Sequence, residues 1–122
     1  MAASPDLTAK VHTIIRTTIG QYYVNQAVTR GLTRANIHPG SVTFMQRFGS
    51  ALNLNLHFHV IFLEGVYLDR TDQGLKPRFV PGEPPTDTDI AAVVQKISRR
   101  VLRKLRQLGY LEVGLDAAVA TV

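Results

Sequence analysis

Apolar residues near the start of the chain recur at intervals of three and four. These positions are Leu7, Val11, Ile14, Ile15, Ile19, Tyr22, Tyr23 and Ala27. This period predicts one amphipathic helix over about residues 5–30. Ser4 can cap its N-terminus with Pro5 in the first helical position, and Gly31 can end it in a left-handed conformation.

The period then changes to two. In SVTFMQRF, residues 41–48, alternation places Val42, Phe44, Gln46 and Phe48 on one face. After Gly49 and Ser50, the run ALNLNLHFHVIFLEG alternates apolar residues on one face with Asn53, Asn55, His57, His59, Ile61 and Leu63 on the other. TDQG, residues 71–74, reads as a turn between short strands at 66–69 and 77–80. We therefore expect an antiparallel sheet of three or four strands over about residues 41–80, preceded by a linker that contains His38.

A second helical period follows the proline-rich segment PGEPPTDTD. Thr86 and Thr88 are cap candidates, and Gly109 is a natural stop, so a helix is expected over about residues 88–108. Its apolar stripe is Ile90, Val93, Val94, Ile97, Val101, Leu105 and Leu108. Its basic residues, with no acid among them, are Lys96, Arg99, Arg100, Arg103, Lys104 and Arg106. They suit contacts with DNA phosphates, or otherwise a solvated helix face.

Together these patterns predict an α+β fold in which helices pack on an antiparallel sheet, as one domain over residues 1–122. The start of the chain lacks a secretory signal, and no apolar run reaches the roughly 18 residues of a membrane span, so we expect a cytoplasmic protein. The net charge of +5 suits a polyanionic partner such as nucleic acid. Cysteine is absent, so any metal site would use nitrogen and oxygen ligands.

His57 and His59 are the candidates for such a site. Residues i and i+2 of a strand share a face, so both imidazoles can be directed at one ion. Asn53 and Asn55 lie on the same face, whereas the opposite face is apolar. Gln46, Asn55 and Glu64 are open alternatives for a third ligand. The simpler interpretation is a pair of histidines that are partly exposed or bonded to backbone.

Residues 42–70, VTFMQRFGSALNLNLHFHVIFLEGVYLDR, closely resemble the metal-binding segment of rolling-circle insertion-sequence transposases of the two-tyrosine HUH class. His57-Phe58-His59 matches the His-hydrophobe-His motif. The flanking QRFGSALNLN and FLEGVY are more specific than the motif, and ISRRVLRKLRQLGYL near residues 97–111 is also similar to the family. The resemblance extends over about residues 36–112.

The resemblance implies an HUH-nuclease fold with both histidines on a central strand. It also implies DNA transposition through single-stranded DNA. His57 and His59 would bind a divalent ion, Mg²⁺ or Mn²⁺, that polarises the scissile phosphate while a tyrosine attacks it. The family's third ligand does not map onto one residue of this chain.

The tyrosines depart from the family pattern, in which two nucleophiles lie on one helix downstream of the histidines. Tyr22 and Tyr23 are upstream and adjacent, so we expect them to be core and boundary residues. Tyr67 and Tyr110 are single. No catalytic residue is assigned, and we expect a truncated transposase domain that is inactive alone.

Two alternatives remain. The first is a non-catalytic basic module that binds nucleic acid and does not respond to metal removal. The second is a different metalloenzyme built on the His-x-His pair, which requires further ligands such as His12 or His38 to converge on it.

Overall fold

The computed structural model describes residues 5–48 and 55–110. Its principal elements are α1 (Pro5–Thr29), β1 (Ile37–Phe48), β2 (Asn55–Leu68), β3 (Arg78–Pro81) and α2 (Asp87–Gln107), with short 3-10 turns η1 (Arg34–Asn36) and η2 (Thr71–Gln73). The chain divides into two compact units, Met1–Pro84 and Pro85–Val122. An antiparallel sheet with helices confirms the predicted α+β class.

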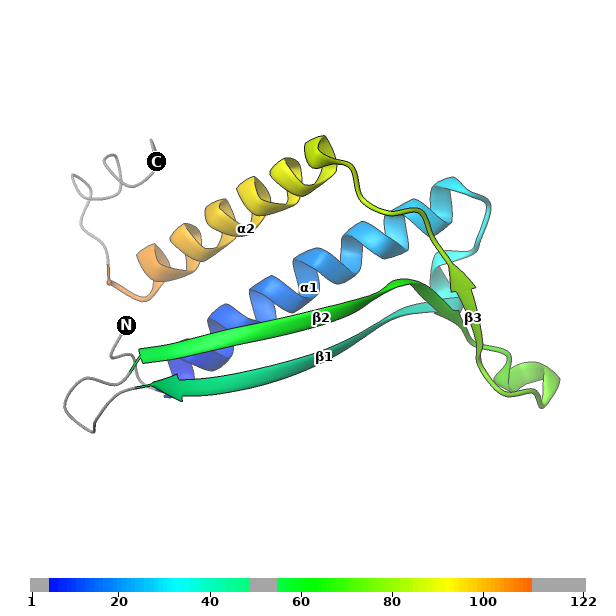
Figure 1. The fold of residues 1–122 in the computed structure, drawn as a ribbon, viewed down its shortest axis with the longest axis horizontal. Coiled ribbons are helices and arrows are strands. Elements are labelled where there is room, and N and C mark those ends of the chain that lie inside the picture. Colours follow the sequence, from blue (N-terminus) through cyan, green and yellow to red (C-terminus); the bar gives the residue numbers. More distant parts are fainter. Residues whose placement is uncertain (1–4, 49–54, 111–122) are drawn as a thin grey trace. The chain divides into compact units, whose positions relative to one another are not determined.

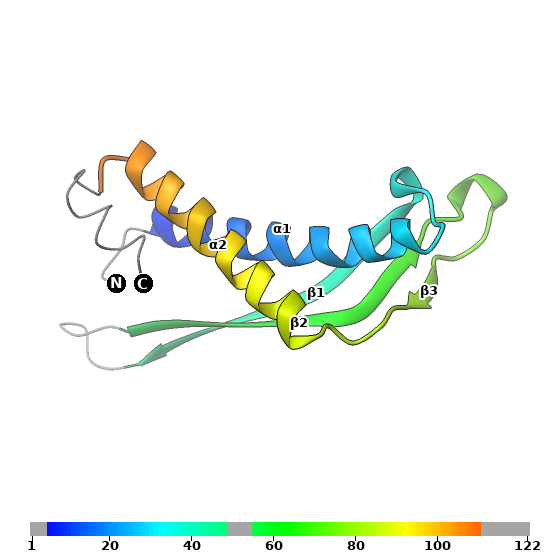
Figure 2. The same ribbon diagram turned by 90° about the horizontal axis from the view of Figure 1, so that it is seen from above.

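The first unit is built on a sheet of order β1-β2-β3, with both strand pairs antiparallel. β2 is the central strand and carries both motif histidines, His57 and His59. Helix α1 lies along the β1–β2 pair, and β3 pairs with the far end of β2 (Figures 1 and 2). One face of the paired strands is therefore turned toward α1, and we call it the inner face. The opposite side is the outer face.

The core lies between the C-terminal half of α1 and the sheet. Tyr23 and Val66 are both buried, and the Tyr23 ring stacks on Phe62 with 6.0 Å between centroids. Gly20 marks the closest approach of the helix, because a Cβ there would lie 3.0 Å from Cγ of Pro39. Glycine is a costly residue inside a helix, and this contact with β1 accounts for its presence.

The pairing of β1 with β2 is irregular near Gly40. While β1 advances two residues from Pro39 to Ser41, β2 moves four residues, from Val66 to Phe62. A Cβ on Gly40 would meet both Leu63 and Tyr67, so these two side chains lie over Gly40 on the same face. The extra residues on β2 therefore change the alignment of the strands but not the face on which alternate residues lie.

Both helices end as their sequences predict. Gly31 follows α1 with φ of 106°, and Leu32 donates its N–H to the Ala27 carbonyl at 3.1 Å. Gly109 follows α2 with φ of 80°. At the start of α2, Thr86 and Asp89 form a capping box, each side chain bonding the other's backbone N–H at 3.1 Å. Pro5 begins α1, whereas the predicted cap Ser4 lies outside the described residues.

Two details of the predicted sheet were wrong. His38 is not in a linker, because β1 already begins at Ile37. Residues 66–68 are the end of β2 and not a separate strand, because Gly65 is a point of close packing within the strand. The predicted turn at 71–74 is confirmed as a 3-10 turn between β2 and β3, which ends at Gly74 in the left-handed region. The interruption and alternation expected over residues 49–54 lie outside the described residues.

The second unit contains α2. Its apolar stripe includes the exposed residues Ile90, Val94 and Leu108, and no described residue of the helix is buried. Among the described residues, neither α1 nor α2 is long and apolar enough to cross a membrane.

Candidate metal and nucleic-acid site

The two faces of the β1–β2 pair differ in their surroundings. Phe58 and Phe62 on the inner face are half-buried and contact rings of α1. On the outer face His59 is exposed, and Ile61 and Val42 keep 57% and 56% of their surface. The predicted separation of a core face from a second face thus holds across the described residues. The second face is more apolar than expected, because Phe44 and Leu63 are exposed there as well.

The backbone register places three candidate ligands together. His57 and His59 are two residues apart on β2 and so share a face. Gln46 of β1 is the direct cross-strand partner of His57, and Phe44 is the partner of His59. Opposed residues of an antiparallel pair have neighbouring Cβ atoms. The side chains of residues 46–48 and 55–57 lie outside the described part of the chain.

Glu64 lies in a different place. Its backbone carbonyl accepts a hydrogen bond from the Gly82 N–H at 2.8 Å, at the end of the β2–β3 pairing. Burial, and secondarily the charge of Glu64, raise the pKa of the Tyr23 hydroxyl on α1. A carboxylate close enough to affect Tyr23 lies toward α1 and away from His59. Of the three alternatives for a third ligand, Glu64 therefore fits least.

His12 of α1 contacts the motif strand from the inner face of the sheet. Its Nε2 is 2.8 Å from the Thr43 hydroxyl, and its ring stacks on Phe58 with 5.5 Å between centroids. Phe58 separates the two motif histidines in sequence and points to the inner face. His12 therefore lies across the sheet from His59. Within the described residues, no three His, Cys, Asp or Glu side chains converge as a metal-binding group.

The tyrosines occupy three environments. Tyr23 is in the core, and Tyr22 is half-buried with an edge-on contact to its ring, as predicted. Tyr67 is on the outer face but eight residues beyond His59, or roughly 20 Å along the sheet, since its cross-strand partner is only six residues from that of His59. Tyr110 is exposed after the end of α2. Among the described residues, no two tyrosines lie within one turn of a helix on the same face.

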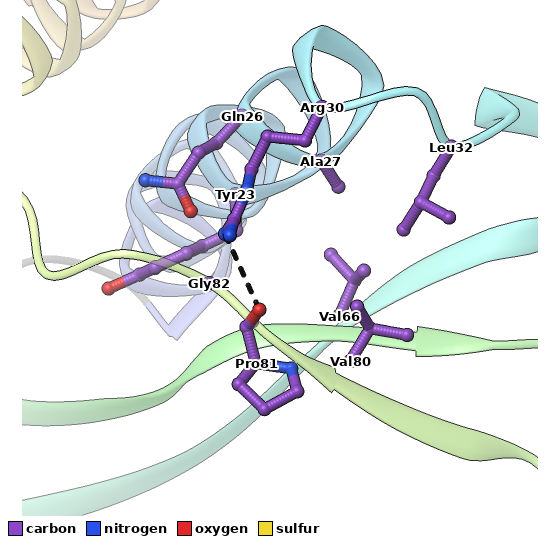
Figure 3. Close-up of a pocket in the computed structure, with 10 residues that line it drawn as sticks. Tyr23, Gln26, Ala27, Arg30, Leu32, Val66, Val80, Pro81 and Gly82 are labelled. Atoms are coloured by element: carbon purple, nitrogen blue, oxygen red, sulfur yellow. Dashed lines mark hydrogen bonds between the residues drawn. The ribbon is translucent and has the colours of Figure 1, made fainter.

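A cavity of about 220 Å³ lies between the end of α1 and the β2–β3 edge (Figure 3). Gln26 lines it and forms two hydrogen bonds of 3.1 Å with the Glu83 backbone: its Nε2 donates to the carbonyl, and its Oε1 accepts from the N–H. Arg30 Nη1 donates to the Pro81 carbonyl at 3.5 Å. Arg30 also pairs with the Glu83 carboxylate at 3.5 Å. These bonds hold the segment after β3 against α1. The cavity is on the inner side of the sheet, so it does not belong to the histidine face.

The basic residues of α2 divide into two groups. Lys96, Arg99, Arg103 and Arg106 are spaced by three, four and three residues, and all four are exposed. We call these four residues the basic face. Lys104 instead lies three residues after Val101 and four before Leu108, at a position within the apolar stripe. Arg100 lies at the border of the two.

A second group of polar residues on the sheet was missed in the sequence. His38 and Tyr67 are cross-strand partners, and with Asp69, Thr71, Lys76 and Pro77 they line an open hollow of about 540 Å³. The pair was missed because His38 was expected in a linker and not in a strand. Alternation along β2 places Tyr67 on the same face as His59, but its pairing with His38 depends on the extra residues of β2 opposite Gly40.

Comparison with protein families assigns the chain. The profile of a family described as "Putative transposase" matches residues 40–118, which include the histidine motif and all of α2. The chain belongs to this transposase family. Neither the curated proteins nor the solved structures contain a match to it. The family assignment agrees with the resemblance seen in the sequence at the level of a transposase.

Proposed function

We propose that this transposase-family chain binds single-stranded DNA and provides the metal-binding part of a DNA-nicking site. The observation that supports this most is the position of the histidine motif. His57 and His59 lie on the central strand, His59 is exposed on the outer face, and Gln46 is paired with His57. A family of transposases acts on DNA, and this is the face of the sheet that α1 leaves accessible.

The donor set fits a divalent ion. Two imidazoles and one amide oxygen give mixed nitrogen and oxygen ligation, which suits Mn²⁺ better than Mg²⁺, since the latter prefers oxygen donors. His57, His59 and Gln46 would hold it. When bound, such an ion stabilises negative charge on phosphate oxygens. Phe58 and His12 would fix the strand from the inner side and so keep the two histidines in register.

The basic face of α2 supports the DNA-binding part of the proposal. Its four cations can each contact a phosphate and release counterions, so affinity should fall steeply with salt. No aromatic residue lies among them, and this favours contact with the backbone rather than the bases.

We assign no nucleophile among the described tyrosines, because no two of them form the pair on one helix that the resemblance implies. Tyr23 is buried, and Tyr67 is roughly 20 Å along the sheet from His59. This chain alone should therefore form little or no covalent adduct with single-stranded DNA. A second candidate function, a basic module that binds DNA without chemistry, is favoured by this same observation.

A thermal melt with and without Mn²⁺ tests the metal site. Mn²⁺ at about one hundred times its Kd should stabilise the folded chain by about 2.7 kcal/mol, seen as a rise in Tm of several degrees. The double variant His57→Ala, His59→Ala should lose this rise, and Gln46→Ala should weaken it.

His38→Ala is the matched control, because it removes an exposed histidine from the same sheet and should leave the rise intact. An equal rise in the double variant would refute the metal site. Single-strand binding that persists in EDTA and in the double variant, with no Mn²⁺ response in the unaltered chain, would favour the non-catalytic module.

A further inference from the structure

The hollow beside His38 and Tyr67 has the composition of a nucleotide site. It offers a cation on Lys76, an imidazole on His38, a hydroxyl on Thr71 and an aromatic ring on Tyr67. These come from two strands and from the segment that joins β2 to β3, so the sheet itself brings them together.

The Tyr67 ring is held in position at this site. Phe79 of β3 contacts it edge-on with 5.3 Å between centroids, and the ring lies over Gly40, where any Cβ would come within 2.9 Å of it. Yet 36% of Tyr67 remains exposed. An aromatic ring that is fixed from two sides and open on another is the usual platform for an unpaired base.

Asp69 does not block the site to an anion. Its Oδ1 accepts hydrogen bonds from the Thr71 hydroxyl and, at 2.9 Å, from the Thr71 N–H. These bonds, and more weakly the charge of His38, hold the pKa of Asp69 below its ordinary value. The carboxylate thus shapes the turn, while Lys76 supplies a positive charge and His38 an imidazole beside it.

We propose that this hollow is a separate subsite for single-stranded DNA, in which Tyr67 stacks on a base and Lys76 with His38 contacts the adjoining phosphate. It lies on the outer face with His59, roughly 20 Å further along the sheet. A DNA strand that runs along that face would therefore also be bound at a point remote from the histidine motif. The inference rests on the proposed binding of single-stranded DNA but not on the metal.

A fluorescent probe can be placed in the hollow because the chain has no tryptophan. Tyr67→Trp would carry the only indole, and stacking on a base should quench its emission by at least half. The titration uses an oligothymidylate of about 20 nucleotides, in EDTA so that the metal site takes no part. Tyr110→Trp, at another exposed tyrosine, is the control and should show little quenching.

A second pair of variants tests the phosphate contact. Lys76→Ala should weaken the affinity for the same oligonucleotide about fivefold, as measured by fluorescence anisotropy. It should also lower the slope of log affinity against log salt concentration by about one. Lys10→Ala removes the same charge from an exposed position on α1, where Lys10 pairs with Asp6 at 2.8 Å, and should change binding less than twofold.

The outcomes separate this subsite from the proposed function. Binding by the unaltered chain, with no quenching at position 67 and equal effects of the two lysine variants, would overturn the subsite alone. Tighter binding or stronger quenching with duplex DNA, or with thymidine monophosphate, would also overturn it. If the unaltered chain binds no single strand at all, the proposed function fails together with the subsite.

Discussion

The ring of His12 stacks on the ring of Phe58 at a centroid distance of 5.5 Å and 24° from parallel, which ties α1 to the strand that carries the histidine motif. His12 also shares a hydrogen bond with Thr43 of β1, so one imidazole contacts both paired strands. Its role is to hold the two strands against the helix. A metal on the outer face would not reach it, because the sheet lies between.

His12→Ala should destabilise the first unit by about 1–3 kcal/mol through the lost ring contact and the unpaired Thr43 hydroxyl. It should leave the Mn²⁺-dependent rise in Tm unchanged. Urea unfolding followed by circular dichroism gives the first quantity, and melting with Mn²⁺ gives the second. Loss of the Mn²⁺ effect while the fold is retained would mean that His12 is a ligand and that the assignment of faces is wrong.

Gly65→Ala should cost about 2–4 kcal/mol of folding free energy. The new Cβ would collide with the Val80 carbonyl oxygen and lie 3.0 Å from the Gly82 nitrogen, and backbone atoms cannot move aside cheaply. Gly74→Ala is the control, because Gly74 has φ of 68° but nothing within 4 Å of a Cβ. It should cost only about 1 kcal/mol, from the strained backbone conformation. Equal costs in urea unfolding would contradict the close approach of β2 and β3.

Tyr23 should make stability fall at alkaline pH. Its pKa is raised in the folded chain, first by burial and then by the charge of Glu64, so the folded state holds the phenol proton more tightly than the unfolded state. The contribution of Tyr23 is therefore fully present below its unfolded pKa of about 10, and it is lost as pH rises through the higher folded pKa.

Tyr23→Phe should lack this part of the decline, which begins above about pH 10. Tyr110→Phe, at an exposed position, should retain it, and Glu64→Gln should bring the absorbance titration of Tyr23 to lower pH. The free energies of unfolding come from urea titrations across this range. An identical decline in Tyr23→Phe and in the unaltered chain would show that other groups cause it.

The sequence was most informative where structure depends on neighbouring residues. Pro5, Gly31, Thr86 and Gly109 act through local backbone geometry, so both helices were predicted to within about two residues. The face shared by His57 and His59 followed from simple alternation.

Pairing between strands could not be predicted in the same way. That Gln46 lies opposite His57 depends on contacts between residues eleven apart, across a segment whose length does not reveal its register. Gly65 is glycine because β3 approaches it closely, and no neighbouring residue in the sequence reveals that contact. The His38–Tyr67 pair was missed for the same reason, since it depends on the irregular pairing opposite Gly40.

That irregular pairing bears on which insertions and deletions the family can tolerate. Between Pro39 and Ser41 the strand β2 contains two residues more than β1. Deleting one residue from this part of β2 would turn every side chain on the motif side of the deletion to the opposite face and place the histidines in the core, whereas deleting two would keep their orientation. Functional relatives should therefore differ in length here by an even number of residues. An odd difference would turn the histidine motif to the inner face.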